Sequence, residues 1–246
     1  MRSQRYFAAA AAFCLALLAG CGGETGSTAE RSVQEGKSLQ SRTIVDMADE
    51  ADTLQKLAEQ ADWIAKIQVE SLSTVESDIA HTQIVPKVLE TYKGSYDGQT
   101  LDISGGILPY AETKAYQSTD RHESGDETAL FYACWSENYV PQEGDVLLFF
   151  GDTQNSANTY YELYSYQGMF LLEDGSYTNQ ALRTGTHKLA DDLQKLQGAV
   201  AADIPETFTR TENGFRYTFE NWGTQTVAVP EQSMEDAIKT YLGEAL

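Results

Sequence analysis

Short apolar or alternating runs, separated by turn residues, recur from residue 63 onward and predict a mostly β fold. The predicted strands span residues 63–69, 82–92, 100–104, 146–150, 160–167, 169–172, 208–210, 215–219 and 226–229. Asp174-Gly175 and Asn213-Gly214 each favour a two-residue hairpin turn between neighbouring runs. Pro86 has no backbone N–H to donate, so the second strand should lie at an edge or carry a bulge there.

Apolar residues at helical spacing predict three short helices around this β body. The first spans residues 53–60, and the second lies between Thr186 as its N-cap and Gly198 as its stop. The third covers residues 234–242, with Ser233 as its cap and Gly243 at its end.

The first 21 residues combine a basic start, a short apolar run and small residues before a cysteine. The apolar run, residues 6–18, is shorter than the stretch of about 20 residues that spans a bilayer. It ends in Leu18-Ala19-Gly20-Cys21, which resembles the lipobox of bacterial lipoproteins. This resemblance implies cleavage after Gly20 and a diacylglyceryl thioether on Cys21. An ordinary secretory signal peptide and an uncleaved anchor are the alternatives.

Lipidation at Cys21 would localise the protein outside the cytoplasm. Each acyl methylene buried in a membrane contributes about 0.8 kcal/mol, so two or three chains such as palmitate hold a protein stably where one would not. We therefore expect an extracytoplasmic protein whose contact with the membrane is the lipid at Cys21.

A second resemblance concerns the body of the chain. Residues 54–61, 62–69, 88–94, 101–106 and 144–150 read as a helix, a strand, a strand ending in Lys-Gly, a strand ending in Gly-Gly and an apolar strand. The pattern is similar to that of bacterial secreted proteins with an OB-like barrel of the netrin-module type. Animal relatives of that barrel inhibit metalloproteinases through a free N-terminal cysteine and disulfides. Because Cys21 would carry lipid and lacks disulfide partners, only the fold is carried over.

The expected fold class is therefore mostly β, a β-rich α+β arrangement. An OB-like or netrin-module-like antiparallel barrel has short flanking helices and a C-terminal hairpin plus helix. The expected segments are a signal peptide (1–20), a lipidated N-terminus with a flexible tether (21–42), the barrel domain (43–203) and a C-terminal hairpin and helix (204–246). Whether the last segment completes the barrel or forms a subdomain stays open.

The excess of acidic residues limits the kinds of partner that the protein can bind. Removal of residues 1–20 leaves 15 lysines and arginines against 37 acidic residues, a formal charge of −22. This charge disfavours nucleic acid and anionic lipid surfaces, while cations, cationic peptides and neutral glycans remain compatible. The alternative is that the charge serves solubility alone.

Few residues point to catalysis. Cys134 is the one cysteine of the expected domain, so no intramolecular disulfide forms, and it reads as a small buried residue rather than a nucleophile. The histidines, His81, His122 and His187, occur singly, and no common hydrolase or nucleotide-binding motif is present. The sequence leans against an enzyme, although a hydrolase with two dispersed carboxylates stays open.

Two segments are candidate sites. Alternation along residues 160–167 would place Tyr160, Tyr164 and Tyr166 on one strand face that stacks on a glycan or peptide, unless the face packs inside the fold. The loop 118–127 gathers Asp120, Glu123 and Asp126, a possible Ca²⁺ site, unless it is simply a solvated acidic loop.

The leading hypothesis from the sequence is a lipid-anchored, non-catalytic module that binds a glycan, a peptide or an envelope protein. The alternatives are an extracytoplasmic hydrolase and a passive structural lipoprotein of the envelope.

Overall fold

A computed structural model describes residues 33–43, 50–76, 80–135, 137–154 and 156–243. Residues 33–246 belong to one compact unit. Cys21 and the lipobox lie outside the described residues, so lipidation stays a prediction. No helix within the described ranges is long and apolar enough to cross a membrane.

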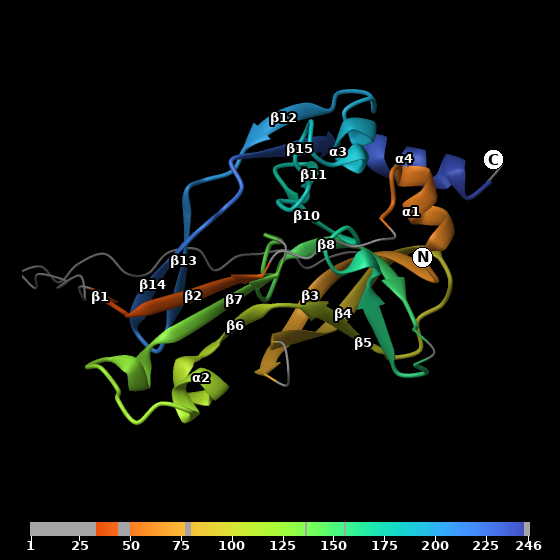
Figure 1. Cartoon of the computed structure of the whole chain (residues 1–246). Coiled ribbons are helices and arrows are strands. Elements are labelled where there is room, and N and C mark those ends of the chain that lie inside the picture. The colour runs from red at the N-terminus through yellow and green to blue at the C-terminus, as the bar shows by residue number, and fades with distance from the viewer. Residues whose placement is uncertain (1–32, 44–49, 77–79, 136, 155, 244–246) are drawn as a thin grey trace, which may run out of the picture. The chain divides into compact units, whose positions relative to one another are not determined.

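Five strands close into a barrel, which confirms the predicted fold class (Figure 1). They follow the order β8-β3-β4-β5-β9, and β9 pairs back onto β8. The pairs are antiparallel except for β5 with β9. The strand bounds are β3 (Trp63–Glu76), β4 (Ala80–Lys93), β5 (Thr100–Ser104), β8 (Val146–Asp152) and β9 (Thr159–Glu162). This closed five-stranded β-barrel is the OB-like architecture expected from the sequence.

Alternation along the strands gives the barrel an inner and an outer core. Ile67 and Phe149 are buried inside the barrel. Leu148 and Phe150 belong to a second core on the outside. Since successive side chains of a strand point to opposite faces, the continuous apolar run of β8 serves both cores at once.

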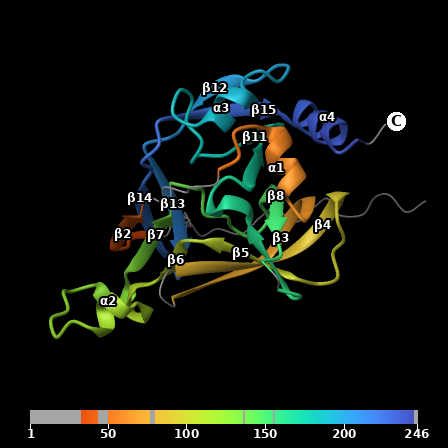
Figure 2. The same ribbon diagram turned by 45° about the vertical axis from the view of Figure 1, so that its right-hand side comes forward.

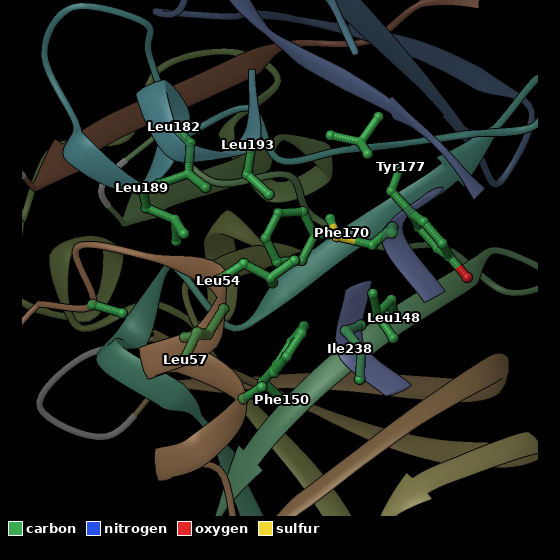
Figure 3. Packing of buried hydrophobic residues seen from close by; sticks show 14 of the residues in the cluster. Leu54, Leu57, Leu148, Phe150, Phe170, Tyr177, Leu182, Leu189, Leu193 and Ile238 are labelled. Carbon is green, nitrogen blue, oxygen red and sulfur yellow. The ribbon is translucent and has the colours of Figure 1, made fainter. Parts of the chain in front are cut away.

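Helices and further strands cover the outer core. They are α1 (Leu54–Gln60), α3 (Lys188–Leu193), α4 (Glu231–Tyr241), β10 (Met169–Glu173), β11 (Ser176–Thr178), β12 (Val200–Asp203) and β15 (Gln225–Pro230). The four strands extend the barrel sheet in the order β12-β15-β11-β10-β8. Leu54, Phe150, Phe170 and Ile238 meet between the helices and this sheet (Figure 3).

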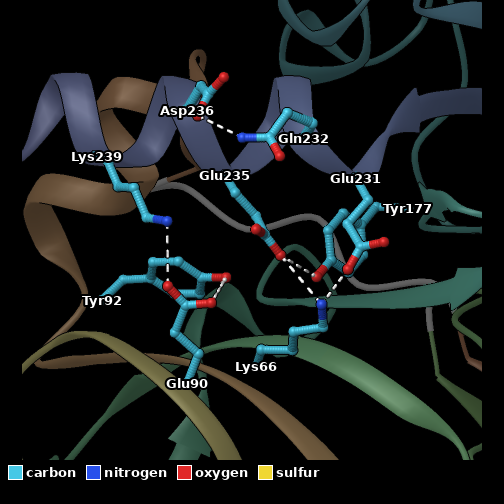
Figure 4. A network of polar contacts seen from close by, with 9 residues as sticks. All are labelled: Lys66, Glu90, Tyr92, Tyr177, Glu231, Gln232, Glu235, Asp236 and Lys239. Atoms are coloured by element: carbon cyan, nitrogen blue, oxygen red, sulfur yellow. Dashed lines mark hydrogen bonds and ion pairs between the residues drawn. The ribbon is translucent and has the colours of Figure 1, made fainter.

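Salt bridges fasten α4 to the barrel exterior (Figure 4). Lys66 Nζ of β3 pairs with Glu231 and lies 3.3 Å from Glu235 Oε1, while the Tyr177 hydroxyl donates to the same oxygen over 3.1 Å. Burial alone would lower the pKa of Lys66, but the Glu231 hydrogen bond and the Glu235 charge outweigh it, so the pKa is raised. The lysine is therefore held in its charged form under the helix.

Two small sheets flank the barrel and enclose a third core (Figure 2). One has the order β1-β14-β13, and the other β2-β7-β6. Their bounds are β1 (Gln34–Glu35), β2 (Ser38–Thr43), β6 (Gly106–Pro109), β7 (Leu130–Trp135), β13 (Thr207–Glu212) and β14 (Phe215–Glu220). Short helical turns η1 (Tyr110–Glu112), α2 (Lys114–Gln117) and η2 (Asp126–Thr128) follow β6. The C-terminal segment is thus divided, because β13 and β14 join a flanking sheet while β15 joins the barrel sheet.

The predicted tether is wrong for residues 34–35 and 38–42, which lie in β1 and β2. β1 pairs in parallel with β14, and β2 with β7. Ser38 Oγ and Gln40 Oε1 accept hydrogen bonds of 3.0 Å from the backbone N–H groups of Thr218 and Glu220. The polar composition predicted a solvated chain, but these polar side chains accept hydrogen bonds from backbone N–H groups along the edge of β14.

The turn chemistry read from the sequence is confirmed. Asp174 and Gly175 have φ of 49° and 75°, and Asn213 and Gly214 have φ of 51° and 83°, as two-residue hairpin turns require. Pro86 pairs with Val69 beside a register shift, so the strand is irregular where the proline lacks a donor.

The predicted helices all form, with different starts for two of them. Thr53 Oγ1 caps α1 by accepting from Lys56 N, as expected. The N-cap of α3 is His187 rather than Thr186. α4 starts at Glu231, before the predicted cap Ser233, whose hydroxyl instead donates to the carbonyl of Gln197.

Candidate functional site

The predicted tyrosine face does not form. β9 ends at Glu162, and the next three residues make a tight turn, η3 (Leu163–Ser165), in which Tyr164 has φ of 57°. Tyr160, 6 % exposed, lies in the barrel core, and Tyr166, 2 % exposed, lies in the outer core. The prediction of one strand through residue 167 is therefore wrong, and the three tyrosines do not share an exposed surface.

Part of the acidic loop binds a lysine of this chain. Lys37 Nζ lies 2.8 Å from Glu123 Oε2 and 2.6 Å from Asp126 Oδ1. The hydrogen bond from Lys37 holds the pKa of Asp126 below its ordinary value. The same hydrogen bond to Asp126 raises the pKa of Lys37. Asp120 is exposed. Within the described ranges, no group of three or more His, Cys, Asp or Glu side chains is placed to hold a metal ion.

Cys134 is buried, as the sequence indicated, with 3 % of its surface exposed. Burial raises the pKa of its thiol to about 11. The thiolate is thus scarce at neutral pH, and the residue serves the third core.

The three histidines each have a structural contact. His81 Nδ1 lies 3.0 Å from Asp102 Oδ1, and the His122 ring stacks on Tyr116. His187 Nδ1 accepts a hydrogen bond of 3.0 Å from Arg183 N, and burial lowers the pKa of His187. His187 is therefore neutral around pH 7.

A groove of about 740 Å³ runs between the barrel and the β13–β14 hairpin. Leu72 and Thr74 of β3 form one wall together with Ile107 of β6. The loop 140–143 and residues 209–212 of β13 form the rest of the lining. Ligand pockets in proteins commonly occupy about 300 to 1,000 Å³ and mix apolar walls with a few polar groups, so the groove has the size and lining of a binding site.

Arg210 is part of the groove lining and ties β13 to the loop 140–143. Its Nη2 donates to the carbonyl of Val140 over 2.5 Å, and its guanidinium lies over the rings of Phe208 and Tyr139 at 5.3 and 5.9 Å. The Tyr139 hydroxyl donates to Asp145 Oδ2 over 2.9 Å, and burial raises the Tyr139 pKa. The β13 edge and the loop are thus tied at one point, beside a groove that stays open.

Glu137 and Glu162 are buried and lie outside the groove lining. Glu137 forms ion pairs with Arg42 and Arg183. Burial raises the pKa of Glu162 to about 8, against hydrogen bonds from Asn138 and the Gly168 backbone that lower it. Both carboxyl groups are held by neighbouring side chains of this chain.

Sequence reasoning missed the groove and Arg210. Its lining comes from four separate segments, and only tertiary packing joins them. The available indication was Arg210 itself, a charged residue at the end of the predicted strand 208–210. In comparisons with known proteins, no family model and no curated protein matches the chain.

Proposed function

We propose that this protein is a lipid-anchored, non-catalytic binding module on the extracytoplasmic side of a membrane, and that its ligand binds in the groove beside β13. The single observation that carries the proposal is the groove itself, about 740 Å³ in volume and lined by both apolar and polar side chains. The OB-like barrel supplies a rigid wall for it.

The lining offers polar and apolar groups for binding a ligand. It presents hydroxyl and amide groups from Thr74, Gln142, Thr209 and Thr211 beside apolar side chains. The buried carboxyl groups that could serve acid chemistry, Glu137 and Glu162, are engaged elsewhere. A neutral or cationic ligand suits the formal charge of −22 expected after removal of the signal peptide.

The proposed anchor sets how far the module reaches. Eleven residues separate Cys21 from Val33. A fully extended chain of that length spans about 40 Å, so lipidation would keep the module near the membrane. Gln34 pairs with Phe215, next to the turn of the β13–β14 hairpin, so the chain enters the module at this end.

Metabolic labelling tests the anchor. Cells expressing the full chain with an alkyne analogue of palmitate should label the wild type and the Cys134→Ser variant but not Cys21→Ser. The Cys134 variant is the matched control, because it removes a cysteine that the proposal leaves unmodified. Labelled Cys21→Ser, or an unlabelled wild type, would contradict the anchor.

A blocking substitution tests the groove. Gln142→Trp puts a bulky side chain into the lining, whereas Gln83→Trp alters an exposed glutamine outside it. The full chain is titrated with neutral oligosaccharides and with polypeptides, and binding is followed by thermal shift. We expect at least one class to raise the Tm of the wild type and of Gln83→Trp, with the shift lost in Gln142→Trp. A shift that survives in Gln142→Trp would overturn the groove as the site.

A further inference from the structure

The groove borders the edge of β13 rather than one of its faces. Four consecutive residues, 209–212, contribute to the lining. Successive side chains of a strand alternate between its two faces, so four in a row can border one cavity only along the strand edge. The backbone of β13 is therefore exposed to the groove.

That edge carries ladder groups that have no strand partner among the described strands. Among the described strands, β13 pairs with β14 alone. Glu212 and Phe215 flank the two-residue turn and form the first hydrogen-bonded pair, so Arg210 and Phe208 also bond toward β14. The N–H and C=O groups of Thr207, Thr209 and Thr211 then point the other way. On that outer side Arg210 Nη1 donates to the Thr209 carbonyl over 3.5 Å, a long hydrogen bond that an incoming strand would replace.

The loop 140–143, which lines the groove across from β13, has few free backbone groups for pairing with an incoming strand. Pro141 has no N–H, and the carbonyl of Val140 already accepts from Arg210. A chain that enters the groove in extended form can therefore pair with β13 and rest its other side on the loop. About four residues of β13 are available for this pairing.

The charges select the occupant. Glu143 and Glu212 line the groove, and the one cation among its lining residues, Arg210, is already bound and stacked. The whole chain carries a formal charge of −20. The exposed Thr209 and Thr211 side chains are small and leave room for long side chains of a partner. Lysine or arginine side chains on an incoming strand would meet the two carboxylates.

We propose that the groove binds an extended basic segment of a partner polypeptide, which adds to the free edge of β13 as a new strand. This inference rests on the proposed function and names its ligand class and binding mode. The affinity comes from main-chain hydrogen bonds, and the preference for basic segments comes from Glu143 and Glu212.

Proline substitutions on the edge separate strand addition from other binding. Thr209→Pro and Thr211→Pro each remove one N–H that points into the groove and none that bonds to β14. Thr207→Pro is the matched control, because it removes an edge N–H outside the lining. Far-UV circular dichroism and Tm of each full-length variant confirm that the hairpin persists.

The probes are fluorescent ten-residue peptides of alternating lysine and threonine, alternating glutamate and threonine, and the lysine peptide with alternate amides N-methylated. We expect the lysine peptide alone to bind, with Kd raised at least tenfold by Thr209→Pro and by Thr211→Pro and unchanged by Thr207→Pro. Equal binding of the acidic or N-methylated peptide, or indifference to both groove prolines, overturns strand addition.

The two proposals fail in different ways. If the lysine peptide does not bind but a glycan shift is lost in Gln142→Trp, strand addition is wrong and the groove remains the binding site. If neither the peptides nor the glycans respond to Gln142→Trp, the groove itself is wrong and the inference falls with it.

Discussion

Asn138 Nδ2 donates a hydrogen bond of 2.8 Å to Oε1 of Glu162, a carboxyl group that the fold buries almost completely. The bond joins the loop after β7 to the end of β9. Tyr132 supports the loop from below, because its hydroxyl donates to the Asn138 carbonyl over 3.3 Å. The pair therefore holds the barrel against the third core.

The buried carboxyl makes stability depend on pH. Its folded pKa of about 8 lies above the ordinary value of 4.5, so the unfolded chain releases this proton first as pH rises. Below pH 4.5 the carboxyl is protonated in both states and does not change the free energy of unfolding with pH. Above pH 8 it is ionised in both states, and the loss of stability is complete and constant. Between these two pH values, the free energy of unfolding should fall by about 1.4 kcal/mol per pH unit. Urea unfolding should show this slope in the wild type and a smaller one in Glu162→Gln. Parallel pH profiles would contradict the assignment.

Much of the fold follows from local chemistry, while the site does not. Asp174-Gly175 and Asn213-Gly214 specify hairpins because few other residues accept their positive φ. Tyr164 adopts a positive φ too, but nothing in its sequence marks it, so the alternation of residues 160–167 was misleading. β2 was missed because its polar side chains bond to a neighbouring strand edge, which composition does not reveal. The groove needs four distant segments at once.

The N-terminal strands should stabilise the module although they read as a tether. A chain of residues 43–246 lacks the pairing of β1 with β14, most of the pairing of β2 with β7, and the ion pairs of Lys37. We expect it to melt at lower temperature than residues 33–246. Thermal unfolding of the two chains by circular dichroism measures the difference. Equal Tm values would show that residues 34–42 add no stability, as expected of a flexible tether.

Lys37 should compete with added cations for the loop. Lys37→Met removes the ammonium group that Glu123 and Asp126 share, so the two carboxylates repel each other and become available to Ca²⁺. We expect a lower Tm than the wild type and a larger gain on addition of millimolar CaCl₂. Lys188→Met, which breaks an exposed pair with Asp52, is the control and should respond as the wild type does. A variant with no added response to calcium would show that the loop carboxylates do not form a site even when freed.

Ile238 connects α4 to the outer core and offers the sharpest test of how that helix is held. Its side chain is fully buried among the residues between the helices and the barrel sheet (Figure 3). Ile238→Ala removes buried methylene groups and leaves a cavity, which costs about 2 to 5 kcal/mol in comparable cores. Val200→Ala changes a side chain that is 59 % exposed, and surface changes of this kind usually stay within about 0.5 kcal/mol. In urea unfolding with unchanged m values, Ile238→Ala should therefore lose about 2 to 5 kcal/mol of unfolding free energy, while Val200→Ala stays close to the wild type. Lys239 Nζ of α4 also lies 3.1 Å from Glu90 Oε1 of β4 (Figure 4). If Ile238→Ala costs no more than Val200→Ala, α4 is held by this ion pair and that of Lys66 rather than by its apolar face.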